Sequence, residues 1–201
     1  MQTAIVILAA GKGTRMKSEM PKVLHEVAGA PLLVHCMKTA QTIDPEHLII
    51  VAGHGSEDVT KTARTYAPDS QIVTQSAQLG TAHAVAQSRE ILSGFEGDLI
   101  ILYGDTPFIR SETLGKLAQA RQKSDLVVLG FQANDPGRYG RLVTSGTDLL
   151  EIVEYKEANS AQKDITLCNS GVLAGPAQLI FQLIEQVETS NNAGELYLTD
   201  C

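Results

Sequence analysis

The chain has 201 residues, of which 43% are hydrophobic and 19% charged, and its formal net charge is -7 at pH 7. This length suits one large domain with a sizeable core, and the acidic balance argues against a nucleic-acid-binding surface. With no run of roughly 18 apolar residues, no signal peptide and no C-x-x-C pair, the sequence indicates a cytoplasmic protein that spans no membrane and whose three cysteines are free thiols.

The first predicted element is a buried strand over residues 4–8, an apolar run rich in β-branched side chains. It leads into a loop over residues 9–16, whose small residues and glycines let backbone N–H groups approach an anion. The loop and the residues just after it carry four cations: Lys12, Arg15, Lys17 and Lys22. In an acidic protein, such a local positive charge indicates a small polyanion such as a nucleoside triphosphate.

This loop differs from two familiar phosphate-binding loops. The dinucleotide motif G-x-G-x-x-G needs a third glycine where Met16 stands, and the P-loop pattern is absent. The strand predicted at 47–53 ends in Gly53-His54-Gly55, which supplies no acid for a ribose. The sequence therefore disfavours a nicotinamide oxidoreductase.

Downstream, strand-like apolar runs alternate with segments of helical spacing, and helices are expected to begin at the hydroxyls of Ser56 and Ser111. This alternation predicts a Rossmann-like α/β fold with a mostly parallel sheet, helices on both faces and ligands beyond the carboxyl ends of the strands. The predicted strands cover 47–53, 71–75, 98–102 and 125–133, and the predicted helices 31–42, 56–66, 81–92 and 111–123.

The second half of the chain changes character. Two strand-like runs at 139–144 and 149–155 flank a turn at 145–148, which predicts an antiparallel hairpin. A further strand is expected at 167–174 and a helix at 176–187, with proline at its start. The final run, 195–201, reads as a strand or helix that is cut off, so we expect a domain truncated at its C-terminal end.

Polar motifs follow two of the predicted strands. Gln75 carries a carboxamide that can read the edge of a base such as uracil, and Gly80 and Thr81 place backbone N–H groups at a helix start. Asp105 follows the strand at 98–102, where a carboxylate suits Mg²⁺ together with phosphate oxygens. Taken alone, each motif could be an ordinary turn or helix cap.

Together the motifs resemble the sugar-nucleotide pyrophosphorylases, nucleotidyltransferases that join a sugar 1-phosphate to a nucleoside triphosphate. The resemblance rests on L-A-A-G-x-G-T-R-M with P-K behind it, on Q-x-x-x-L-G-T-x-H-A from Gln75, and on Y-G-D-x-P from Tyr103. It implies catalytic roles for Arg15, Lys22 and Asp105, with Asp105 also as the Mg²⁺ ligand. It further implies nucleotide contacts from Leu8, Ala9, Ala10, Gly11, Gly13, Thr14, Gln75, Gly80 and Thr81.

Three segments at 138–141, 153–156 and 168–171 are similar, in order, to the branch of this family that makes UDP-N-acetylglucosamine. This resemblance implies a nucleotide-binding half over 1–133 and an antiparallel sugar-binding half over 134–201. The implied sugar-binding residues are Tyr103, Tyr139, Gly140, Glu154 and Asn169.

The reaction implied by the resemblance is in-line transfer of UMP from UTP to N-acetylglucosamine 1-phosphate, with release of pyrophosphate, feeding peptidoglycan and lipopolysaccharide precursors. Bacterial members are usually bifunctional, with a C-terminal left-handed β-helix that acetylates glucosamine 1-phosphate and through which the full-length protein is expected to form a trimer. None of that domain is present in these 201 residues. A second metal ligand, an asparagine, is likewise expected beyond residue 201.

Two related alternatives remain open. A thymidylyl- or cytidylyltransferase acting on another sugar phosphate would share the first loop, but not the segments around Glu154 and Asn169. A non-catalytic nucleotide-sensing module would be expected to have lost Arg15, Lys22 or Asp105, and all three are present.

Overall fold

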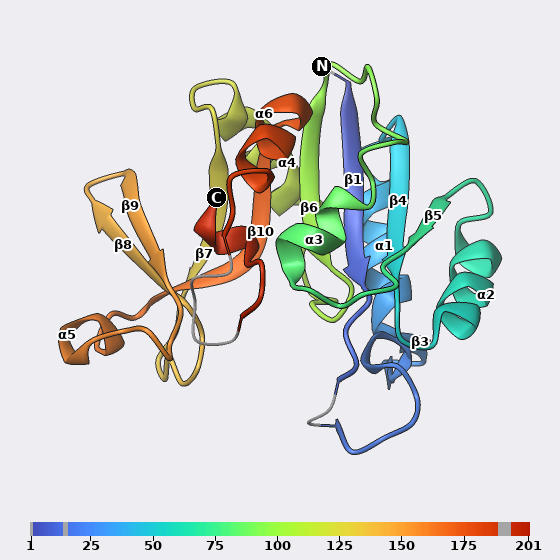
Figure 1. The fold of residues 1–201 in the computed structure, drawn as a ribbon, viewed down its shortest axis with the longest axis horizontal. Coiled ribbons are helices and arrows are strands. Elements are labelled where there is room, and N and C mark those ends of the chain that lie inside the picture. Colours follow the sequence, from blue (N-terminus) through green and yellow to red (C-terminus); the bar gives the residue numbers. More distant parts are fainter. Residues whose placement is uncertain (1, 14–15, 189–193) are drawn as a thin grey trace.

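The computed structural model describes residues 2–13, 16–188 and 194–201. These residues form one eight-stranded mixed sheet in the order β5-β4-β1-β6-β10-β8-β9, with β7 paired to β10, and a separate two-stranded hairpin of β2 (Glu26–Val27) and β3 (Ala30–Pro31) (Figure 1). The strands of the large sheet are β1 Thr3–Ala9, β4 His47–Ala52, β5 Gln71–Thr74, β6 Asp98–Tyr103, β7 Val127–Gln132, β8 Arg141–Ser145, β9 Asp148–Val153 and β10 Leu167–Pro176.

The parallel part of the sheet is built around β1. This strand pairs in parallel with β4 on one edge and with β6 on the other, and β5 extends the sheet beyond β4. In chain order the four strands therefore lie 3-2-1-4, so the direction of winding reverses between β1 and β6. Ligands of such folds bind outside the carboxyl ends of the strands at this reversal point. The predicted α/β fold class is confirmed.

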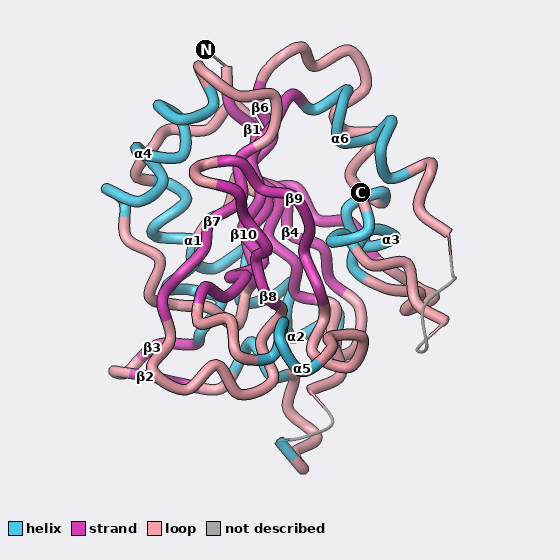
Figure 2. The backbone as a smooth tube through the Cα atoms, turned by 90° about the vertical axis from the view of Figure 1, so that its left-hand side faces the viewer, coloured by secondary structure: helices cyan, strands magenta, loops and turns pink. Residues whose placement is uncertain are grey.

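Helices cover both faces of the sheet because β1 is apolar on both sides. Ile5 and Ile7 pack toward the face of α1, α2 and α4, whereas Ala4 and Val6 pack toward α3 and α6 (Figure 2). Both isoleucines are fully buried, and burial of each contributes about 1.5–3 kcal/mol. The helices are α1 Leu32–Gln41, α2 Ser56–Tyr66, α3 Thr81–Ala86, α4 Ser111–Arg121, α5 Ser160–Lys163 and α6 Ala177–Ile184.

The strand predicted at 125–133 exists as β7, but its neighbour was not foreseen. Both β6 and β7 pair antiparallel with β10, so they run parallel to each other, as the α4 crossover between them requires. However, β10 is inserted between them, and Leu173 faces Ile101 on one edge and Val128 on the other. The other end of β10 pairs with β8 through Cys168 and Arg141. One strand thus joins the parallel sheet to the β8–β9 hairpin.

Two predicted helix caps were wrong. The residue that caps α2 is Gly55, with φ of +65°, and the residue that caps α4 is Arg110, with extended backbone. Neither helix has a side-chain cap, and both serines are the first helical residues instead. A side chain at 55 would overlap the ring of Pro21, so the glycine lets the loop after β1 pack against the start of α2.

The hairpin and the free cysteines are as expected, whereas two elements are shorter than expected. The β8–β9 hairpin turns through Gly146, whose φ is +62°, and all three cysteines are free. The helix predicted at 81–92 ends at Ala86, and the final run forms only the short 3-10 helix η3 (Leu198–Asp200), not the expected strand or longer helix.

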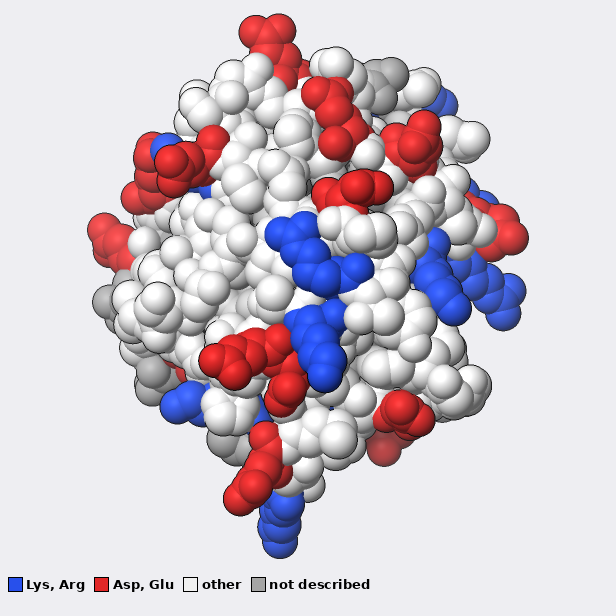
Figure 3. Space-filling model, turned by 90° about the vertical axis from the view of Figure 1, so that its right-hand side faces the viewer, with Lys and Arg blue, Asp and Glu red and all other residues white. Residues whose placement is uncertain are grey.

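In the part of the chain that the structure describes, no helix has both the length and the apolar character needed to cross a bilayer. On the face shown in Figure 3, basic side chains gather in two adjoining groups near the centre, and acidic side chains lie around them.

Candidate nucleotide and sugar site

A cavity of about 390 Å³ lies at the carboxyl ends of β1 and β6, at the reversal point of the sheet. The loop after β1, the segment after β5 and the residues that end β6 all contribute to it. It collects many of the residues expected from the sequence, namely Leu8, Ala10, Gly11, Gly13, Lys22, Gln75, Gly80, Thr81, Tyr103 and Asp105. It also contains Lys12, one of the four cations that the sequence associated with a polyanion, together with Val23, Gln78, Ala84 and Glu195, for which the sequence had suggested no site role.

Lys22 and Asp105 meet inside this cavity. Lys22 begins the short 3-10 helix η2 (Lys22–Leu24), and its Nζ donates to Asp105 Oδ2 at 2.5 Å. The lysine side chain is 37% exposed and the aspartate 28%, so the pair lies open to solvent and contributes at most about 1 kcal/mol to stability. Gly13, with φ of +59°, allows this approach, because a Cβ there would lie 2.7 Å from Lys22 Cβ.

The segment after β5 presents Gln75, which is only 4% exposed. Its Nε2 donates to the Gly80 carbonyl at 3.0 Å and lies 2.9 Å from His83 Nδ1. Nearby, Gln78 Nε2 donates to the Ala10 carbonyl at 2.9 Å and so ties this segment to the loop after β1. The two loops form one wall of the cavity.

Residues 194–201 pack against the same segment. The Leu196 N–H donates to the Leu79 carbonyl at 2.7 Å, the Leu196 carbonyl accepts from the Ala82 N–H at 2.9 Å, and the Leu198 N–H donates to Thr81 Oγ1 at 2.8 Å. Gly80 has φ of +119°, and a Cβ there would overlap the Leu196 backbone. The Thr81 hydroxyl thus accepts from the C-terminal segment. Sequence reasoning missed this contact, for which Gly80 was the only local signal.

Three of the expected sugar-binding residues lie together at the other end of β10. The Asn169 N–H donates to the Gly140 carbonyl at 2.9 Å, and a Cβ on Gly140 would lie 3.4 Å from Glu154 Oε1. Asn169 Oδ1 accepts from the Gly171 N–H, which leaves its Nδ2 as the group able to donate. Burial raises the pKa of the Glu154 carboxyl, nearby Asp200 raises it further, and a hydrogen bond from Thr199 opposes both.

The two expected tyrosines occupy different surroundings. The Tyr103 ring packs over Gly171, where a Cβ would lie 2.6 Å from Cε2, and burial raises the pKa of the Tyr103 phenol to about 12. Tyr139 is 53% exposed, and its ring stands edge-on to Phe131 at 4.9 Å. It lines a separate cavity of about 620 Å³ that reaches Asp105 from another side.

Among the described residues expected at the nucleotide site, Ala9 does not line the cavity. The Ala9 side chain is 1% exposed and packs in the core on the face of α1, so only its backbone remains available to a ligand. Thr14 and Arg15 lie outside the described residues.

Arg141 is a buried cation to which the sequence assigned no role. It is 2% exposed, and its guanidinium donates to the carbonyls of Gly137, Tyr139 and Lys163. It forms no ion pair with any residue that the structure describes, and the Tyr155 ring lies 5.8 Å away. The guanidinium therefore fixes the turn that presents Gly140.

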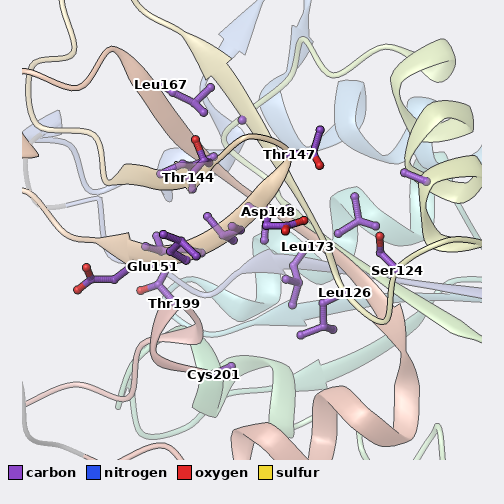
Figure 4. A pocket seen from close by; sticks show the side chains of 18 of the residues that line it. Ser124, Leu126, Thr144, Thr147, Asp148, Glu151, Leu167, Leu173, Thr199 and Cys201 are labelled. Carbon is purple, nitrogen blue, oxygen red and sulfur yellow. The ribbon is translucent and has the colours of Figure 1, made fainter.

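A larger cavity, of about 1100 Å³, contains none of the expected site residues. It lies between the β8–β9 hairpin, the ends of β7 and β10 and the last residues of the chain (Figure 4). Asp148 of the hairpin lies on the side of Leu126 and Leu173, whereas the Glu151 side chain points away from them. Because the motif residues gather elsewhere, we place the candidate site in the smaller cavity and at the Gly140–Glu154–Asn169 cluster.

A metal ion would depend chiefly on Asp105. Within residues 2–13, 16–188 and 194–201, no three His, Cys, Asp or Glu side chains gather into a metal site. Mg²⁺, however, commonly takes one or two carboxylates and completes its shell with water and substrate phosphates. Asp105 Oδ1 has no partner in this part of the chain, and it lies in the same cavity as the loop after β1. The donor set therefore fits a magnesium ion shared with phosphates.

Comparison with known proteins gives consistent results. The model of the MobA-like NTP transferase domain matches residues 5–168. The bifunctional protein GlmU of Ruegeria sp. (strain TM1040) is 53% identical over 200 residues, which is 100% of this chain and 44% of the relative. That of Cereibacter sphaeroides (strain ATCC 17025 / ATH 2.4.3) is 52% identical over 197 residues, 98% of this chain and 43% of the relative. The chain thus spans less than half the length of these relatives.

Solved structures share the fold at low sequence identity. A UDP-glucose pyrophosphorylase complexed with UDP-glucose superposes with a TM-score of 0.76 at 18% identity, covering 100% of this chain and 85% of the other. HddC from Yersinia pseudotuberculosis superposes with a TM-score of 0.74 at 21% identity, covering 99% and 84%.

Proposed function

The chain belongs to the family of MobA-like NTP transferase domains, and from that premise we propose that it is a sugar-phosphate nucleotidyltransferase. The specific reaction proposed is transfer of UMP from UTP to N-acetylglucosamine 1-phosphate, yielding UDP-N-acetylglucosamine and pyrophosphate. The full-chain identity to bifunctional GlmU proteins and the three motif segments of the sugar half support this choice.

One observation carries the proposal. Lys22 and Asp105 meet at 2.5 Å in a cavity walled by the loop after β1 and by the segment around Gln75. A cation, a metal-binding carboxylate and a glycine-rich loop are what a site needs in order to bring two polyanions together. The cavity also has Lys12 in its wall, which adds a second positive charge toward a triphosphate.

The chemistry needs no activated protein nucleophile. A sugar phosphate monoester has a second pKa near ~6, so it is mostly dianionic at pH 7 and can attack the α-phosphorus of UTP directly. The backbone N–H groups of Gly11 and Gly13 receive the phosphates, and Lys22 neutralises charge that builds at the α-phosphate. Arg15 is proposed to hold the leaving pyrophosphate.

Asp105 is the residue proposed to hold Mg²⁺. When bound, the ion supplies charge neutralisation between the phosphates of the two substrates. The protein's part is to offer Oδ1 while Lys22 donates to Oδ2. Opening this exposed ion pair costs little, so phosphate binding can redirect Lys22 without a large energetic penalty.

The sugar is proposed to bind at Gly140, Glu154 and Asn169. Glu154 accepts from sugar hydroxyls, Asn169 donates through Nδ2, and the Gly140 N–H remains on the strand edge. The absence of a Cβ at 140 keeps about one methyl group of room beside Glu154 Oε1. A cell-wall precursor role, the second activity and the trimeric assembly expected of the full-length protein remain predictions.

The decisive experiment is a matrix of substrates. Pyrophosphate release is measured for UTP, CTP, GTP and dTTP against N-acetylglucosamine, glucose and mannose 1-phosphates, with and without Mg²⁺. The proposal expects the largest rate for UTP with N-acetylglucosamine 1-phosphate and dependence on added metal. Preference for dTTP or CTP would point to the related transferases. UTP binding without turnover, also in a chain extended past residue 201 to include the expected second metal ligand, would point to a sensing module.

A further inference from the structure

Gln75 reaches the cavity with its amide held in one direction. Its Nε2 donates to the Gly80 carbonyl at 3.0 Å, and a carbonyl oxygen can only accept. The atom facing that carbonyl must therefore be the amide nitrogen, which places Oε1 on the other side. Oε1 has no donor among the described residues, and Gln75 lines the cavity, so Oε1 is the atom left for a ligand.

His83 takes the second hydrogen of the same amide. Its Nδ1 lies 2.9 Å from Gln75 Nε2, and because that nitrogen is a donor, Nδ1 must accept. The imidazole is therefore in the tautomer with its proton on Nε2. In this tautomer, the 3.2 Å approach of Gln87 Nε2 to His83 Nε2 joins two donors and is no hydrogen bond, and Gln87 is held instead by its bond to the His83 carbonyl at 3.0 Å.

The Gly80 carbonyl and His83 Nδ1 together determine which hydrogen-bonding group of Gln75 is available to a ligand. Both amide hydrogens are used inside the protein, so the side chain presents a pure acceptor to the cavity. Uracil has a ring N–H at N3 that would donate to it, whereas cytosine has a lone pair at that position. To donate to cytosine N3, the Gln75 amide would have to rotate so that Nε2 faced the cavity. This rotation would break its hydrogen bonds to the Gly80 carbonyl and to His83 Nδ1, and without His83 only the first would be lost.

From this geometry we propose that His83 is a positioning residue that sets the base preference of the site, favouring a pyrimidine with a ring N–H over one with a ring acceptor. His83 contacts Gln75 and Gln87, and it is not itself among the residues that line the cavity. The inference rests on the proposed function, because it assumes that a pyrimidine nucleotide binds in this cavity.

The test compares UTP and CTP binding by calorimetric titration in four proteins. His83→Ala removes the acceptor, and His83→Asn keeps one at a similar place in Oδ1. His35→Ala is the matched control, because His35 lies on α1 and bonds the Val27 carbonyl away from the cavity. Each ratio of dissociation constants is measured within one variant, so partial loss of folded protein does not distort it.

We expect the wild type and His35→Ala to prefer UTP, and His83→Ala to lose about tenfold of that preference, the equivalent of one hydrogen bond. His83→Asn should restore most of it. Equal weakening of both nucleotides in His83→Ala, with the ratio preserved, would overturn the role of His83 while leaving the proposed function intact. Failure of the wild type to bind either nucleotide would overturn both.

The tautomer offers an independent readout. A ¹H–¹⁵N correlation of the histidine side chains should show His83 with an unprotonated Nδ1 and a protonated Nε2, in the wild type and in the Gln87→Ala variant. A proton on Nδ1 would contradict the inference, because the Gln75 amide would then have to be oriented without His83.

Discussion

Lys22 Nζ and Asp105 Oδ2 lie 2.5 Å apart although the residues are separated by 83 positions in the chain. The contact exists because β1 and β6 are neighbours, so the loop after one strand and the turn after the other open into the same cavity. It places a positive charge beside the proposed metal ligand, where charge on a transferring phosphate would develop.

Replacing Lys22 by alanine should lower turnover by roughly 10²–10³ with little change in the KM for UTP, because the lysine acts on charge that appears only in the transition state. Steady-state pyrophosphate release measures both quantities. Lys61→Ala, on the exposed side of α2, is the control and should behave as the wild type. Equal damage to KM and kcat would assign Lys22 to ground-state binding.

Replacing Gly80 by alanine should both strain the backbone and detach the C-terminal segment. At φ of +119° an L-residue is strained, and its Cβ would overlap the Leu196 backbone. We expect a loss of about 1–3 kcal/mol in the free energy of unfolding and a higher KM for UTP, measured by urea denaturation and by kinetics.

Gly94→Ala is the matched control for that change. Gly94 also has a positive φ, of +78°, but no atom lies within 4 Å of where its Cβ would stand. It should show the backbone cost alone, with an unaltered KM. If Gly80→Ala raised KM no more than Gly94→Ala, the packing of Leu196 on Gly80 would have no bearing on the nucleotide site.

Replacing Arg141 by methionine should remove the buried guanidinium that donates to the carbonyls of Gly137, Tyr139 and Lys163. A hydrogen bond to a charged group contributes about 1.5–3 kcal/mol, so we expect a lower free energy of unfolding. Arg141→Lys, with a single ammonium group, should recover only part of it. The specific expectation for Arg141→Lys is a raised KM for the sugar phosphate with an unchanged KM for UTP, because the affected turn presents Gly140. Equal changes in both would show a general loss of structure.

The partly buried carboxyl of Glu154 should make stability depend on pH in a definite direction. Its pKa is raised by burial, whereas in the unfolded chain it titrates at its ordinary value. Between the two values, the folded state binds more protons, so the free energy of unfolding falls as pH rises through that window. Glu154→Gln should lose this slope and be more stable at neutral pH, as measured by urea denaturation from pH 4 to 8.

A companion variant checks the cause of that slope. Thr199 donates to Glu154 Oε1 at 3.4 Å and opposes the rise in pKa. Thr199→Val should therefore extend the falling part of the stability curve to higher pH. An identical slope in Glu154→Gln and in the wild type would mean that another group is responsible.

Patterns close together in the chain predicted most of the fold. Patterns of a few residues predict three of its elements: the apolar run predicts β1, the helical spacing predicts α1, and the glycine turn predicts the β8–β9 hairpin. The insertion of β10 between β6 and β7 has no such signal, because strand pairing depends on which edges remain free after the rest of the sheet has formed. The wrong caps at Ser56 and Ser111 arose because hydroxyls near a helix start do not reveal whether the preceding residue takes the cap position.

The same distinction applies to the site. Gln75, Gly80 and Asp105 follow strands, so their common location could be expected from topology alone. His83 acts through a ring nitrogen whose role depends on the orientation of another side chain. The Leu198 N–H reaches Thr81 Oγ1 across 117 positions. The spacing of residues in the sequence predicts neither of these two contacts.

The placement of β10 also restricts how the molecule can move. One edge of this strand bonds β7, and the other bonds β6 near Leu173 and β8 near Cys168. A motion that moved the proposed nucleotide and sugar regions apart would have to break backbone hydrogen bonds along β10. The span between the proposed nucleotide site and the proposed sugar site is therefore fixed by backbone pairing, and we expect substrates of different length to be accommodated by the side chains and loops at the rim.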